Sequence, residues 1–215
     1  MEKGLIITLP RYDDTTEYLS QWSREIIEEA EKKNIKFKEL NDEGANKCDF
    51  EKVVKKLDYK LLVFNGHGAE DSIGGYRDEI LVEEGKNEDI LAERITYSRS
   101  CNSAASLGIR CMKNNVGGCF IGYGVLYMFY INQKWVTNPI KDKTASLFLS
   151  SSNLVPISIL KGNSCWEAHQ RSKKQTLKNM KNVLRTKTQD SFLIAQALWN
   201  NYVGQKIIGN FEAKL

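Results

Sequence analysis

The chain has 215 residues, of which 41% are hydrophobic and 27% are charged, and its formal net charge is +4 at pH 7. This length and composition predict one globular domain over residues 1–215, with enough apolar residues for a substantial core. No apolar run approaches the roughly 18 residues of a transmembrane span, and the Met-Glu-Lys start lacks the apolar core of a secretory signal. We therefore expect a cytoplasmic protein with no membrane partner.

The cysteine and histidine content argues against disulfide and metal chemistry. Five cysteines are an odd number, and no two of them form a C-x-x-C pair, so the sequence indicates neither a disulfide framework nor a zinc knuckle. The only histidines are His67 and His169. We expect no metal site and no cofactor.

The first part of the chain alternates apolar runs with amphipathic stretches. Residues 4–9 predict a buried strand, and residues 15–33 predict a helix whose apolar positions recur every three or four residues. Residues 35–40 alternate as a strand near a sheet edge does. A short helix capped by Asp49 then leads into an apolar strand at residues 61–64. This order predicts a parallel sheet with helices packed on it.

The second part continues the pattern with longer connections. Paired glycines at 74 and 75 and another at 85, around a short apolar run, predict a surface hairpin that projects over the strand ends. A strand ends near Cys101, and a helix is expected from Asn102 to about Asn114. Further elements are predicted as a strand at 117–123, an aromatic connection at 123–135 that rims a cleft, helices at 142–150, 164–184 and 190–201, and a last strand at 203–208.

Two strand patterns end in reactive side chains. LLVFNG leads to His67, and RITYSRS leads to Cys101. The carboxyl ends of neighbouring parallel strands form the crevice where ligands bind in an open sheet, so this histidine and this cysteine are expected to face each other there. Such a pair is the minimum for nucleophilic catalysis by a thiol.

The chemistry of the pair needs a thiolate and a base. A cysteine at the amino terminus of a helix is expected to have a lowered thiol pKa because of the helix dipole and the free N–H groups. His67 would take the thiol proton and later protonate the leaving amine. The backbone N–H groups of Gly68 and Cys101 would hold the oxyanion of the tetrahedral intermediate.

Each of these residues alone also has a structural interpretation. A histidine at a strand end is more often a hydrogen-bonded structural residue, and a lone cysteine is usually a small buried hydrophobe. Cys111 and Cys119 are expected in the core, Cys48 in a polar loop, and His169 on the surface. The pairing of His67 with Cys101, each after a strong strand pattern, favours the catalytic interpretation.

These blocks resemble those of the caspase-like cysteine peptidases of clan CD, a group that includes caspases, gingipains, clostripain, separase and the bacterial CHAT-type proteases. NGHG at 65–68 and YSRSCNSAASLG at 97–108 are similar to the two blocks of the bacterial CHAT and gingipain-like branch. Three later stretches look like its C-terminal half: SSSNLVPISILKG, the WEAHQRS helix and ALWNNYVGQKIIGN. The caspase sequence QACRG is absent around Cys101, and no residue pattern defines a specificity pocket.

The resemblance implies a caspase-hemoglobinase fold, which is an α/β three-layer sandwich with a mostly parallel sheet and helices on both faces. It also implies a catalytic dyad of His67 and Cys101 and endopeptidase activity on a protein substrate. Small relatives of this family are often found in prokaryotic defence or cell-death systems, including antiviral defence, so a regulatory or sensor protein is an expected partner.

A basic stretch leaves a second class of function open. Residues 161–187 contain eight basic residues and the single acid Glu167. A solvated helix face is the simplest explanation, a charged docking surface for a protein is the second, and nucleic acid is not expected. The alternative to the peptidase is therefore a non-catalytic α/β binding or regulatory module with a basic docking helix. No phosphate-binding glycine motif supports it.

Overall fold

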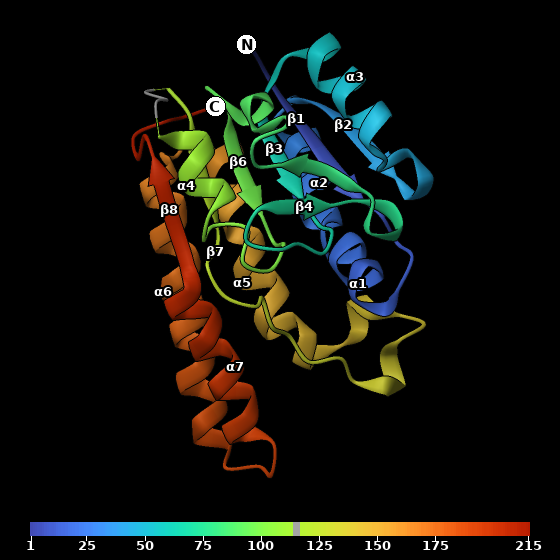
Figure 1. Ribbon diagram of the computed structural model, residues 1–215. Coiled ribbons are helices and arrows are strands. Elements are labelled where there is room, and N and C mark those ends of the chain that lie inside the picture. The colour runs from blue at the N-terminus through green and yellow to red at the C-terminus, as the bar shows by residue number, and fades with distance from the viewer. Residues whose placement is uncertain (114–116) are drawn as a thin grey trace.

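Six strands form the central sheet, in the spatial order β2-β1-β3-β6-β7-β8 (Figure 1). The computed structural model describes residues 1–113 and 117–215. The strands are β1 Glu2–Leu9, β2 Lys36–Asn41, β3 Tyr59–Phe64, β6 Ile95–Ser98, β7 Cys119–Tyr123 and β8 Gln205–Gly209. The first five run parallel, and β8 pairs with β7 in the antiparallel direction. This confirms the expected α/β class and mostly parallel sheet.

Helices cover both faces of the sheet. The helices are α1 Asp14–Trp22, α2 Arg24–Lys32, α3 Lys47–Leu57, α4 Leu107–Met112, α5 Lys143–Leu160, α6 Cys165–Thr186 and α7 Ser191–Gly204. Single 3₁₀ turns lie at Asp42–Gly44, Tyr76–Asp78, Glu88–Leu91, Gln133–Trp135 and Pro139–Lys141. The arrangement is compatible with a three-layer α/β sandwich. Among the described helices, none has both the length and the apolar character needed to cross a membrane.

Alternation along the strands divides the core into two layers. Leu61, Val63 and Tyr97 point to the face covered by α2, α5 and α6. Leu62 and Phe64 point to the opposite face, with α3 and α4. These side chains are at most 1% exposed, and burying each apolar one contributes roughly 1.5–3 kcal/mol. Strands buried on both faces explain the near-continuous apolar runs in the sequence.

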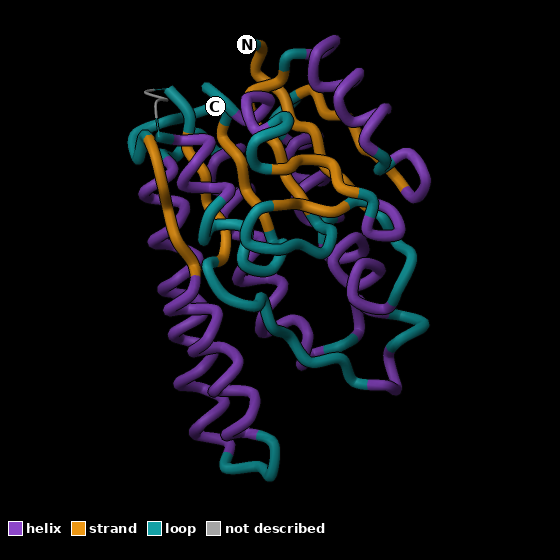
Figure 2. Tube along the Cα trace, in the orientation of Figure 1, coloured by secondary structure: helices purple, strands orange, loops and turns teal. Residues whose placement is uncertain are grey.

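The predicted hairpin is confirmed as β4 Ser72–Gly74 paired with β5 Ile80–Glu83, lying in front of the sheet in Figure 1. The connection between β7 and α5 contains no strand among its described residues and runs as loop with two short helical turns (Figure 2). Its first part, residues 124–131, is called the capping segment below.

Two helix boundaries differ from the predictions because tertiary contacts override local signals. The single helix expected at 15–33 is two helices, separated at the buried Ser23. The side chain of Ser23 accepts hydrogen bonds from Asn65 and Arg99. The helix expected to end at 150 continues to Leu160 through Pro156. An interior proline costs about 3 kcal/mol, and the packing of α5 against the sheet, between α2 and α6, offsets that cost.

Three helix starts also differ from the predictions. Asp13 caps α1, two residues before the expected helix start, and Asn46 rather than the expected Asp49 caps α3. The helix expected from Asn102 begins only at Leu107. Its expected end near Asn114 lies outside the described residues.

Candidate active site

His67 lies three residues beyond β3, at the carboxyl edge of the sheet. Gly66, which precedes it, sits against the hairpin so closely that a Cβ atom there would lie 1.9 Å from the carbonyl oxygen of Gly74. The Gly66 carbonyl also accepts a hydrogen bond of 2.8 Å from the Ser100 hydroxyl. The backbone before His67 is thus held to the hairpin on one side and to the neighbouring strand end on the other.

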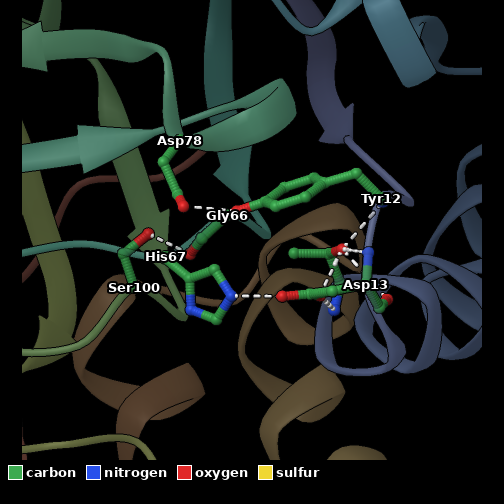
Figure 3. A network of polar contacts seen from close by, with 7 residues as sticks. Tyr12, Asp13, Gly66, His67, Asp78 and Ser100 are labelled. Atoms are coloured by element: carbon green, nitrogen blue, oxygen red, sulfur yellow. Dashed lines mark hydrogen bonds and ion pairs between the residues drawn. The ribbon is translucent and has the colours of Figure 1, made fainter.

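Asp13 orients the His67 ring. The two side chains are joined by a contact of 2.7 Å between His67 Nε2 and Asp13 Oδ2 (Figure 3). Partial burial alone would raise the pKa of Asp13, but hydrogen bonds from His67 and Thr16 outweigh burial and lower it. An ionised carboxylate can only accept, so Nε2 carries the proton. When the ring is neutral, Nδ1 is left as the basic nitrogen.

Cys101 lies three residues beyond β6 and is half-buried. Its thiol donates a long hydrogen bond of 3.9 Å to the carbonyl oxygen of Tyr127 in the capping segment. The expected lowering of its pKa is wrong for this state, since burial raises the pKa of the Cys101 thiol. The reason is local: residues 101–106 are turns, Asn102 has a φ of 57°, and α4 starts too far along the chain to act on the thiol.

The strand register relates the two residues directly. β3 and β6 are adjacent and parallel, and Phe64 pairs with Ser98 at their carboxyl ends. His67 and Cys101 follow three residues later on each chain segment. Asn65 and Arg99 lie two residues before His67 and Cys101, and the Arg99 guanidinium donates a hydrogen bond of 2.8 Å to Asn65 Oδ1. No hydrogen bond joins His67 to Cys101 among the described residues.

Both side chains contact elements on the α1 side of the sheet. His67 meets Asp13, the cap of α1, while Cys101 packs against an apolar cluster that includes Tyr18 of α1. Gly68 lies against the second strand end, since a Cβ atom there would be 2.6 Å from Ser100 Cβ and 3.2 Å from the Cys101 carbonyl oxygen. Within the described chain, the backbone N–H groups of Gly68 and Cys101 donate to no other residue, and the N–H of Cys101 faces its own thiol.

Arg99 is the centre of a buried hydrogen-bond network below His67 and Cys101. The sequence did not predict this network. It is 1% exposed, and its guanidinium donates to Asn65 Oδ1, to Ser23 Oγ at 2.6 Å and to Asn153 Oδ1 at 2.9 Å. Asn65 in turn donates to the Thr8 carbonyl on β1. A charged residue inside an apolar strand pattern was the available signal, because a buried guanidinium requires polar partners.

Tyr12 and the hairpin form the rim beside His67. The Tyr12 ring lies edge-on to His67 and to Tyr76, with centroid distances of 6.1 and 5.8 Å. Its hydroxyl donates to Asp78 (Figure 3). Burial, together with Asp78, raises the pKa of Tyr12.

The remaining candidate residues lie elsewhere. Cys111 and Cys119 are buried, as expected. Cys48 is exposed but belongs to α3 rather than to a loop, and Cys165 is buried beside Cys119. His169 is buried, not on the surface, and burial together with Lys173 lowers its pKa to about 4.

Comparison with known proteins provides no further assignment. The sequence matches no protein-family model, and no curated protein matches it.

Proposed function

We propose that this chain is a cysteine endopeptidase that cleaves a protein substrate with His67 and Cys101 as its catalytic dyad. The observation that carries the proposal is the register of β3 and β6. It brings the two strand ends to the same edge of the sheet, and the Asn65–Arg99 hydrogen bond holds them together just before the dyad. We further propose membership of the caspase-like peptidases of clan CD, with a caspase-hemoglobinase fold and a role in a prokaryotic defence system.

Proton transfer follows from the Asp13 contact. With Nε2–H donated to Asp13, Nδ1 of His67 takes the proton of the Cys101 thiol. The thiolate attacks the carbonyl carbon of the scissile peptide, and the imidazolium then protonates the leaving amine. Water hydrolyses the resulting thioester with His67 again as the base.

The oxyanion is stabilised by backbone donors. The N–H groups of Gly68 and Cys101 belong to adjacent strand ends and donate to no other residue of the described chain. Removing one such donor costs roughly 2.7–4 kcal/mol in enzymes where it has been measured.

The described state is a resting one. The thiol is hydrogen-bonded to the capping segment instead of to His67, and burial raises its pKa. Turnover requires the capping segment to move or the Cys101 side chain to rotate toward Nδ1 of His67. A regulatory protein partner would supply that change.

The test compares cleavage of a peptide library by wild type and by Asn201→Ala, a variant that loosens the capping segment. Cleavage should vanish in Cys101→Ala and His67→Ala, each made in both backgrounds, while Cys48→Ala, at an exposed cysteine, retains it. A panel of peptide chloromethyl ketones should alkylate Cys101. If neither protein cleaves any peptide and no reagent of the panel modifies Cys101, the peptidase proposal is wrong and the non-catalytic binding module takes its place.

A further inference from the structure

A groove between α5 and α6 is unrelated to the dyad. It has a volume of about 750 Å³. Six of its lining residues are basic and none is acidic: Lys161, Arg171, Lys174, Lys178, Lys181 and Arg185. This groove accounts for most of the basic stretch noted in the sequence.

The positive charge of the groove is largely uncompensated. Lys161 forms an ion pair of 3.5 Å with Glu29 of α2. For the other five cations, no carboxylate of the described chain lies within ion-pair distance. All five are exposed and follow one another along α6 at intervals of three or four residues, so they form a single row. Lys173, by contrast, points to α7 and lies over the Tyr202 ring.

The floor of the groove is apolar. Leu154 and Ile157 of α5 and Leu177 of α6 line it and are all half-buried. Exposed ion pairs alone contribute little to affinity, whereas aliphatic side chains lying beside the row of charge offer surface that a partner can bury. The residues next to Leu154 are fixed from the sheet side, since Asn153 accepts a hydrogen bond from Arg99.

We propose that this groove binds an acidic amphipathic helix of a partner protein. Such a helix presents carboxylates every three or four residues, which matches the row on α6, and its apolar face covers the floor. The row from Arg171 to Arg185 spans about 21 Å at the helical rise, which corresponds to four turns of the partner. The proposal does not depend on the endopeptidase activity.

The lining favours a helix over other anionic partners. The groove has no aromatic side chain on which nucleic-acid bases could stack. A membrane surface would contact the outward-facing cations but would not reach a floor recessed between two helices. Charge complementarity together with an aliphatic floor therefore points to a protein helix.

Fluorescence polarisation tests the proposal with a labelled 21-residue helical peptide carrying Glu at three- and four-residue spacing and Leu on one face. Its scrambled counterpart has the same composition. We expect the patterned peptide to bind, and the scrambled peptide to bind at least about tenfold more weakly. The triple variant Lys174→Glu/Lys178→Glu/Lys181→Glu should lose at least about tenfold in affinity. The matched triple variant Lys52→Glu/Lys55→Glu/Lys56→Glu, on α3, should bind like the wild type.

The floor has its own test. Leu177→Ala should weaken binding several-fold at low and at high salt, whereas Leu184→Ala, at an exposed position outside the groove, should not. Equal binding of the patterned and scrambled peptides, or equal loss in the two triple variants, would overturn the proposal. A 20-nucleotide RNA or phosphatidylserine vesicles could instead bind more tightly than the patterned peptide and lose that binding in the Lys174→Glu/Lys178→Glu/Lys181→Glu variant. In that case the partner of the groove would be nucleic acid or membrane, and not a helix.

Discussion

At the scale of single residues, Asp13 has two roles. Its carboxylate caps α1 by accepting from the Thr16 N–H at 2.7 Å and also accepts from Nε2 of His67. Its lowered pKa keeps it ionised at neutral pH, and the His67 contact is lost only as the pH falls through that lowered value. One side chain thus links the start of α1 to the proposed catalytic base.

Asp13→Asn separates the two roles. Asparagine caps a helix about as well as aspartate, so the free energy of unfolding should change by less than about 0.5 kcal/mol. An amide no longer requires a proton on Nε2, so activity should fall about 10²- to 10⁴-fold. Steady-state kinetics and urea unfolding measure the two effects. Asp14→Asn, at the exposed neighbour, is the control, and equal activity of both variants would show that Asp13 acts only as a cap.

At the scale of elements, the capping segment connects α7 to the thiol. The side-chain amide of Asn201 on α7 holds the Met128 backbone by two hydrogen bonds. Its oxygen accepts from the Met128 N–H at 2.9 Å, and its nitrogen donates to the Met128 carbonyl at 2.6 Å. Side chains alternate along the segment, with Tyr127 turned inward and Leu126 and Met128 exposed. The carbonyl of Tyr127, between the residues held by α7, accepts from Cys101.

Asn201→Ala should release the capping segment and expose the thiol. The pKa of Cys101 is raised above its ordinary value of 9.0 by burial, so thiolate is scarce at pH 7 and labelling by iodoacetamide should accelerate as the pH rises. Exposure lowers this pKa, and each unit gives about a tenfold faster reaction at neutral pH. We expect Asn201→Ala to label Cys101 several-fold faster at pH 7, as read by mass spectrometry.

Asn200→Ala provides the control for that variant. Asn200 donates an exposed hydrogen bond to the Leu126 carbonyl and a long one of 3.5 Å to Asn201 Oδ1, but none to Met128, so its loss should change the labelling rate less. Hydrogen exchange at the Met128 amide should accelerate only in Asn201→Ala. If Cys101 were labelled at the wild-type rate in that variant, the capping segment would not control access to the thiol.

At the scale of the whole molecule, Arg99 joins the sheet to the helices of one face. It bonds Asn65 at the sheet, Ser23 at the junction of α1 and α2, and Asn153 on α5. A single buried guanidinium therefore fixes the helices of one face against the strand ends that carry the candidate dyad.

Arg99→Met should destabilise the protein strongly. Methionine fills much of the volume, but Asn65 and Asn153 lose donors to their buried amide oxygens, at about 1–3 kcal/mol each. We expect the free energy of unfolding in urea to fall by about 2–5 kcal/mol. Arg24→Met, at an exposed position on α2, should change it by less than about 0.5 kcal/mol. A similar small change for both variants would refute the cross-linking role of Arg99.

The sequence by itself determined the local elements and the two candidate residues. Apolar periodicity is a property of neighbouring residues, so the strands before His67 and Cys101, the hairpin and α6 could all be predicted from it. The expected parallel order followed because helices separate the first three strands along the chain. The proposed dyad could be named for the same reason, since both residues come directly after strong strand patterns.

Only the tertiary structure decided what surrounds those residues. Asp13 reaches His67 across 54 positions, and the Tyr127 carbonyl reaches Cys101 across 26. The break at Ser23 and the passage of α5 through Pro156 likewise depend on contacts with distant segments. The thiol pKa rises instead of falling because burial by the capping segment acts on it and the dipole of α4 does not. Such effects arise from packing between residues far apart in the chain, which no local pattern encodes.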